Sequence, residues 1–124
     1  MGRVTIFFDT YAFFEVLKKN PNYNNFLKNF SIITTRLNLM ELYYGLIKNY
    51  DAKVADYAYD YLLKYVVEIE DEVIKEAMWF KLRNKRRKLS YVDCVGYVIA
   101  LRNNVKLLIG DRQFKGLENV EFVL

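Results

Sequence analysis

Hydrophobic and polar positions along this chain follow two different periods, and the two kinds of segment alternate. A short, almost wholly apolar run over residues 4–8 is typical of a buried strand, and the mainly apolar segments 31–34, 66–69, 105–109 and 120–123 are further strand candidates. Apolar residues spaced three and four apart predict helices over residues 11–19, 23–30, 36–48, 51–64, 71–86 and 91–102. Alternating strands and helices predict a three-layer α/β/α fold with a central, mainly parallel sheet.

The length of 124 residues suits one folded unit, and no repeat, low-complexity tract or linker divides it. We therefore expect one domain over residues 1–124. The first apolar run has five residues and stops at Asp9, which is too short for a signal-peptide core or a membrane-spanning helix. We expect no association with a membrane.

The chain has no histidine and one cysteine. The missing histidine excludes Ser-His-Asp and Cys-His nucleophile systems, histidine-assisted RNA cleavage and zinc sites that need imidazole. A single cysteine forms no intrachain disulfide, which favours a reducing, cytoplasmic location. Cys94 follows an acid in an apolar helix, and we expect a packed core thiol there. Any catalysis must come from carboxylates, hydroxyls, lysines or arginines, with a bound ion.

Glu41 is an acid in a helix that is apolar on nearly all sides. Its neighbours three and four residues away are Leu37, Asn38, Tyr44 and Gly45, none of them basic. A buried charge costs several kcal/mol unless something pairs with it. No cap or turn explains an acid at this position, so we expect a functional role.

Three other acids, Asp9, Asp93 and Asp111, follow strands or begin helices and have a local explanation as well. Asp9 fits a helix N-cap, Asp93 a capping box with Ser90, and Asp111 a turn. Function in parallel sheets gathers at the carboxyl ends of the strands. If all four acids converge there, their mutual repulsion requires cations, and oxygen ligands select Mg²⁺ or Mn²⁺.

The formal net charge is +4, and its distribution is uneven. Residues 51–80 carry eight acids and three lysines, whereas residues 81–88 carry six positive charges and no acid. Such a block is typical of a surface that binds nucleic acid, although a solvated helix end has the same composition. The candidate phosphate-binding residues are Arg83, Lys85, Arg86, Arg87 and Lys88.

Aromatic residues have a structural explanation at most positions. Tyr57, Tyr61 and Tyr65 fall on one helical stripe, which favours a core or dimer contact over a base-stacking surface. Trp79 precedes the basic block, and we expect it to pack inside rather than stack on a nucleotide.

The order of four motifs along the chain resembles the PIN domain family, and most closely its VapC-type toxins. The motifs are Asp9-Thr10, Glu41-Leu42-Tyr43-Tyr44-Gly45, Ser90-Tyr91-Val92-Asp93 and Asp111-Arg112-Gln113-Phe114. The resemblance implies a Mg²⁺- or Mn²⁺-dependent ribonuclease whose acidic pocket comprises Asp9, Glu41, Asp93 and Asp111, supported by the hydroxyls of Thr10 and Ser90. It also implies a homodimer inhibited by a small antitoxin protein. Many members carry Thr and a second acid where this chain has Ile109 and Gln113.

Three functions follow as hypotheses. The first is a metal-dependent endoribonuclease that cuts single-stranded or loop RNA, with metal-assisted attack by water. The second is a catalytically silent PIN-like module that binds RNA or a protein through the same surface. The third is a structure-specific DNA nuclease, because metal chemistry alone does not exclude DNA.

Overall fold

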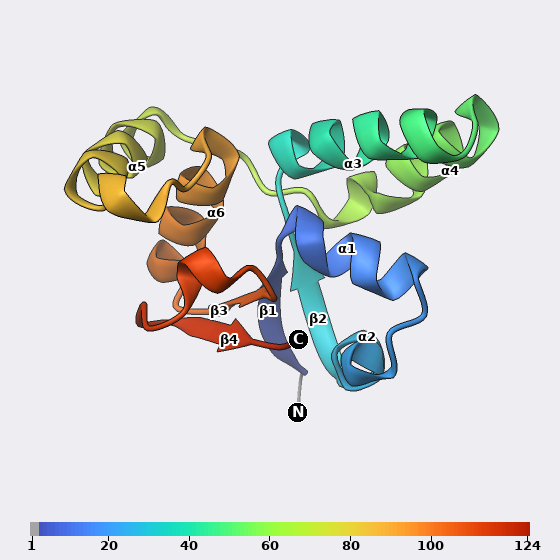
Figure 1. The fold of residues 1–124 in the computed structure, drawn as a ribbon, viewed down its shortest axis with the longest axis horizontal. Coiled ribbons are helices and arrows are strands. Elements are labelled where there is room, and N and C mark those ends of the chain that lie inside the picture. Colours follow the sequence, from blue (N-terminus) through green and yellow to red (C-terminus); the bar gives the residue numbers. More distant parts are fainter. Residues whose placement is uncertain (1–2) are drawn as a thin grey trace.

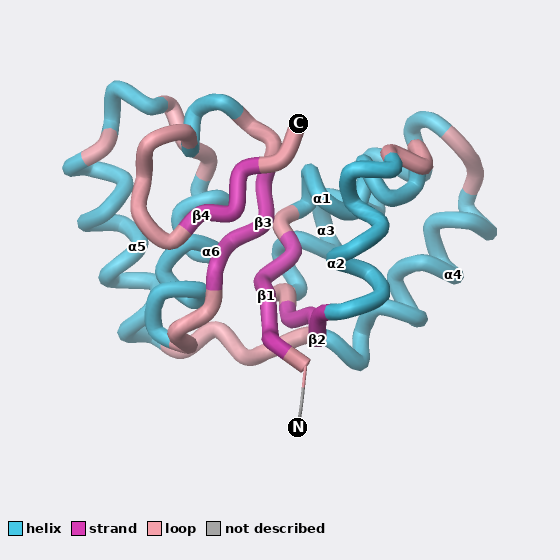
Figure 2. Tube along the Cα trace, turned by 90° about the horizontal axis from the view of Figure 1, so that it is seen from below, coloured by secondary structure: helices cyan, strands magenta, loops and turns pink. Residues whose placement is uncertain are grey.

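A computed structural model describes residues 3–124, in which four strands form one sheet. The strands are β1 (Val4–Phe8), β2 (Phe30–Ile33), β3 (Lys106–Ile109) and β4 (Val120–Phe122). They lie in the order β2-β1-β3-β4 and are all parallel, with Ile6 of β1 opposite Ile32 of β2 and Lys106 of β3. Figure 2 shows β1 and β3 side by side in the middle of the molecule.

Helices cover both faces of this sheet (Figure 1). They are α1 (Thr10–Leu17), α2 (Asn24–Asn29), α3 (Arg36–Asn49), α4 (Ala52–Leu62), α5 (Asp71–Arg83) and α6 (Tyr91–Arg102). Single 3₁₀ turns lie at Pro21–Tyr23, Leu63–Tyr65, Lys85–Arg87 and Arg112–Phe114. Helices α5 and α6 lie on one side, and α1 to α4 lie on the other. The predicted three-layer α/β/α class is confirmed.

Two hydrophobic cores fill the space between the sheet and its two helical layers. Side chains alternate along β1, so Phe7 packs with α5 and α6 while Ile6 and Phe8 pack with α1, α3 and α4. Cys94 is fully buried in the first core, and burial raises the pKa of its thiol to about 11. The interpretation of Cys94 as a core thiol is confirmed.

Residues 66–69 do not form the predicted strand. Val66 makes a single parallel bridge to Thr34, just beyond the end of β2, and the chain then leaves the sheet edge. Val67 and Ile69 pack instead against the core beneath α6. Four residues of which three are apolar cannot distinguish a strand from a buried connection, which explains the error.

Trp79 and the tyrosine stripe also differ from expectation. Trp79 is 62% exposed, because the buried face of α5 is formed by Val73, Ala77 and Phe80. Tyr57 is 73% exposed and its ring stacks on that of Tyr61, with ring centroids 6.1 Å apart. Neither Trp79 nor Tyr57 belongs to the core, and the dimer contact expected of the tyrosines stays a prediction.

Gly110 joins β3 to the loop that carries Asp111, and it has no room for a side chain. A Cβ atom there would lie 2.3 Å from Cε1 of Tyr11 and 2.6 Å from the carbonyl oxygen of Val123. Because a backbone atom must move, we expect Gly110→Ala to lower the free energy of unfolding by about 2 kcal/mol. Urea denaturation measures this loss, and an unchanged unfolding midpoint would contradict the tight packing.

Within residues 3–124, none of the helices combines the length and the apolar character that crossing a membrane requires.

Candidate active site

Three strand ends meet at one edge of the sheet and place the candidate residues. Asp9 follows the central strand β1, Thr34 and Thr35 follow β2, and Asp111 follows β3 after Gly110. Parallel strands bring their carboxyl ends to one side, so three adjacent strands deliver their first loop residues to the same region.

Asp9 is the most deeply buried of the four acids, with 4% of its surface exposed. One carboxylate oxygen, Oδ2, accepts a hydrogen bond from the backbone N–H of Tyr11 at 3.0 Å and caps α1. The other, Oδ1, is buried and has no hydrogen-bond partner among the described residues. Burial, with the charges of Asp93 and Glu41, raises the pKa of Asp9 from 3.8 to about 8.

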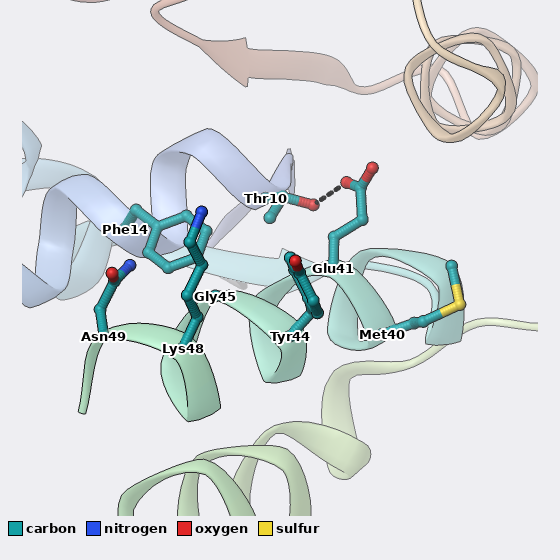
Figure 3. A pocket seen from close by; sticks show the side chains of 8 residues that line it. All are labelled: Thr10, Phe14, Met40, Glu41, Tyr44, Gly45, Lys48 and Asn49. Carbon is teal, nitrogen blue, oxygen red and sulfur yellow. Dashed lines mark hydrogen bonds between the residues drawn. The ribbon is translucent and has the colours of Figure 1, made fainter. Parts of the chain in front are cut away.

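Glu41 reaches the site from α3 and is held by Thr10. The Thr10 hydroxyl donates to Oε1 of Glu41 at 2.7 Å, as Figure 3 shows. Burial raises the pKa of Glu41, the Thr10 hydrogen bond opposes that shift, and the charge of Asp93 adds to it. An acid in an apolar helix is therefore half-buried and aimed at the strand ends.

Asp93 lies in the first turn of α6 and forms a reciprocal capping box with Ser90. Its Oδ2 accepts from the backbone N–H of Ser90 at 2.9 Å, and its own N–H donates to the Ser90 hydroxyl at 3.0 Å. Burial raises the pKa of Asp93, and the Ser90 hydrogen bonds and the Lys81 charge oppose that shift. Asp111 caps the following 3₁₀ turn, where its Oδ1 accepts from the N–H of Gln113 at 2.9 Å.

The four acids form one electrostatic group with Asp93 at its centre. The charge of Asp93 raises the pKa of Asp9 and Glu41, and the charge of Asp111 raises that of Asp93. In the part of the chain that the structure describes, no three acidic or cysteine side chains have the spacing to ligate one ion as they stand. Even so, the donor set is entirely hard oxygen, and the buried Oδ1 of Asp9 lacks any partner. These two features fit Mg²⁺ or Mn²⁺.

The sequence matches the family model described as "PIN domain" over residues 6–120. The chain belongs to the PIN domain family. No curated protein sequence matches this PIN domain.

Solved structures share its fold at low sequence identity. The chain is similar to VapC20 of Mycobacterium tuberculosis, described as a sarcin-ricin loop cleaving toxin, with a TM-score of 0.81 and 16% identity over 94% of this chain and 97% of that one. It is also similar to a chain of VapBC2 from Rickettsia felis bound to a promoter DNA fragment, with a TM-score of 0.71 and 18% identity over 97% and 98%. A toxin–antitoxin complex from Klebsiella pneumoniae is similar with a TM-score of 0.72 and 16% identity, over 94% of this chain and 95% of that one.

Two polar residues that support the site of this PIN domain escaped the sequence analysis. Asn38 is fully buried and donates to the Thr10 hydroxyl at 3.2 Å, while its own Oδ1 accepts from the Thr35 hydroxyl at 2.6 Å. This chain of hydrogen bonds fixes Thr10 and, through it, Glu41. The available signal was an asparagine one turn before Glu41 in the same apolar helix.

Lys81 is the second missed residue. Its ammonium donates to the carbonyl of Leu89, directly before the cap of α6, and lies 4.9 Å from the ring centroid of Tyr91. Its charge lowers the pKa of Asp93. The sequence placed Lys81 at the start of the basic block, and the fold turns it toward the acids instead.

The basic block of the PIN domain divides into exposed and engaged members. Arg83, Lys85, Arg86 and Lys88 are exposed. Arg87 donates from Nη1 to the carbonyls of Gln113 and Lys115, both at 2.9 Å, and so holds the loop after β3. The Gln113 side chain, with its amide nitrogen toward the block, donates to the carbonyls of Arg87 and Lys88 at 3.0 Å. Gln113 thus ties two loops together.

Proposed function

We propose that this PIN domain is a Mg²⁺- or Mn²⁺-dependent endoribonuclease that hydrolyses phosphodiester bonds in single-stranded or loop RNA. The observation that carries the proposal is Asp9, a buried carboxylate that has one unpartnered oxygen and whose pKa the charges of Asp93 and Glu41 help to raise. PIN domains are nucleases that generally use divalent metal ions, and this acid group supplies the ligands that such an ion prefers.

Four carboxylates, those of Asp9, Glu41, Asp93 and Asp111, would hold the ion. A bound ion of this kind lowers the pKa of a water molecule and neutralises charge on the phosphate oxygens. The protein's own part is orientation: local caps fix Asp9, Asp93 and Asp111, and the Thr10 hydroxyl fixes Glu41. Each acid then has its second oxygen available, and no histidine is needed.

The biological role we propose is that of a toxin in a toxin–antitoxin pair. The Klebsiella pneumoniae structure is a toxin–antitoxin complex, and VapC20 is described as a sarcin-ricin loop cleaving toxin. By the same likeness we propose a small antitoxin partner. We also propose a homodimer and a cytoplasmic location. The single buried cysteine is consistent with a reducing compartment.

A catalytically silent module remains the alternative, and Gln113 favours it. At this position many PIN domains carry a second acid, whereas here the Gln113 amide is directed to the carbonyls of Arg87 and Lys88. The neighbouring Ile109 is fully buried and offers no hydroxyl. These two residues leave fewer ligands near Asp111.

Cleavage of RNA and DNA of one sequence tests the proposed function. We expect the protein to cut a single-stranded RNA in Mn²⁺, to cut the matching DNA much more slowly, and to stop in EDTA. Asp93→Asn should remove the activity, and Asp60→Asn, an exposed acid on α4, should retain it. Equal cutting by wild-type protein and Asp93→Asn would reject the site, and no cutting by either would support the silent module.

Exposed cations of the basic block should bind RNA phosphates. We expect Lys85→Glu with Arg86→Glu to raise the Kd for single-stranded RNA about tenfold at 50 mM salt and to reduce the salt slope by about 1.4. Fluorescence anisotropy at several salt concentrations measures both quantities. Lys28→Glu with Lys53→Glu makes the same charge change on α2 and α4 and serves as the control. Equal effects of the two pairs would mean that the block has no special role.

A further inference from the structure

A pocket opens beside the acid group, between α1 and α3. It has a volume of about 660 Å³ and is lined at one end by Thr10 and Glu41 and at the other by Lys48 and Asn49. Figure 3 shows Glu41, Tyr44 and Lys48 along α3, with Glu41 reaching toward Thr10 and Lys48 lying beside Phe14 of α1. Their spacing of three, four and seven residues places them on the same helical stripe.

The depth of this pocket depends on Gly45. A Cβ atom at Gly45 would lie 2.3 Å from Cζ of Phe14, so only glycine lets the Phe14 ring rest against α3. The pocket floor is therefore an aromatic ring on helix backbone. Tyr44 forms a second aromatic wall, and it is 65% exposed although it lies beside a half-buried acid.

Polar groups stand at both ends of this aromatic floor. At the inner end the Thr10 hydroxyl and the Glu41 carboxylate belong to the candidate active site. At the outer end Lys48 makes no ion pair with any residue of 3–124. A ligand that suits the pocket has a flat ring for Tyr44 and Phe14 and an anion for Lys48, and it continues into the acid group.

We propose that this pocket holds one unstacked nucleotide of the RNA, next to the bond that is cut. Its base lies on the Tyr44 ring, and its outer phosphate lies on the Lys48 ammonium. The proposal rests on the ribonuclease function proposed above. It also explains a preference for single-stranded or loop RNA, because a base paired in a duplex cannot leave its stack to enter the pocket without an unpairing cost.

Binding of two single-stranded octamers tests this pocket, one an ordinary RNA and the other a chain of the same length without bases. Measured by anisotropy in an Asp9→Asn background with Mn²⁺, Tyr44→Leu should raise the Kd of the RNA about tenfold and leave that of the abasic chain unchanged. Lys48→Gln should reduce the salt slope of both by about 0.7, the contribution of one phosphate contact. Tyr57→Leu and Lys53→Gln on α4, outside the pocket, should change neither.

Each outcome decides the proposal. If Tyr44→Leu weakens both octamers equally, or weakens RNA no more than Tyr57→Leu does, the pocket does not hold a base. Light scattering checks whether Tyr44→Leu converts a dimer to a monomer. If it does, and if RNA binding weakens only where the dimer is lost, Tyr44 is a contact between two copies and the proposal is overturned. Cleavage by the wild-type protein is scored separately. If the protein binds RNA in a base-dependent way but does not cleave it, the nucleotide pocket is supported and the ribonuclease function is rejected. If the protein cleaves RNA and Tyr44→Leu does not change the rate, the ribonuclease function is supported and the nucleotide pocket is rejected.

Discussion

Asp9→Asn is expected to reduce RNA cleavage by at least about a thousandfold, to the level seen in EDTA. Asparagine is as good an N-cap as aspartate, and its side-chain oxygen can still accept from the N–H of Tyr11. The substitution keeps the shape of the site and removes one negative charge from its most buried position. The loss therefore reports metal binding rather than folding, and initial rates in Mn²⁺ measure it.

A second aspartate provides a matched control for this substitution. Asp51 caps α4 in the same way, since its Oδ1 accepts from the N–H of Val54 at 2.9 Å, but it is exposed and lies away from the acid group. Asp51→Asn should leave cleavage unchanged. If Asp9→Asn retained the wild-type rate, or if both variants lost activity equally, the acid group would not be the active site.

The metal-free protein is expected to lose stability as the pH rises from about 4 to about 8. In the unfolded chain Asp9 releases its proton near 3.8, whereas in the folded protein its pKa is about 8. The folded state thus binds the extra proton throughout this interval, and each unit of pH there lowers the free energy of unfolding. At about 1.4 kcal/mol per unit over this interval of about four units, the total loss is on the order of 5–6 kcal/mol.

Urea denaturation in EDTA at pH 5 and pH 8 measures this dependence. Asp9→Asn should remove most of the slope and be the more stable protein at pH 8, with a remainder from Asp93 and Glu41, whose pKa values are also raised. Mn²⁺ at about a hundred times its Kd should add about 2.7 kcal/mol to the wild type at pH 8. Stability that rose with pH in EDTA, equally in both proteins, would mean that Asp9 is ionised in the fold.

Local patterns predicted the backbone positions of three of the four candidate acids, because helix caps and turns place them. In Asp9, Asp93 and Asp111 one carboxylate oxygen accepts the capping hydrogen bond, so the cap leaves the other oxygen of each acid for a second role. For these three acids a capping role and a metal-binding role do not exclude each other. The sequence indicated Glu41 as a candidate because its helix is largely apolar and its neighbours three and four residues away include no cation.

Tertiary packing decided the features that the sequence analysis missed. Asn38 and Lys81 act on Thr10 and on the start of α6, contacts that span 28 and 8 residues and leave no periodic trace. Trp79 is exposed because α5 buries only the stripe of Val73, Ala77 and Phe80, and burial preference by residue type cannot indicate which side of a helix faces the core.

Binding of Mn²⁺ to the purified protein tests the central claim, that Asp9, Glu41, Asp93 and Asp111 form one metal site. Calorimetric titration of the wild type at pH 7.5 should show saturable binding, and Asp9→Asn, Glu41→Gln and Asp93→Asn should each raise the Kd at least about tenfold. Asp51→Asn should bind like the wild type. If the wild type bound no Mn²⁺, or if the three variants bound it as tightly as Asp51→Asn does, the account of this site would be contradicted.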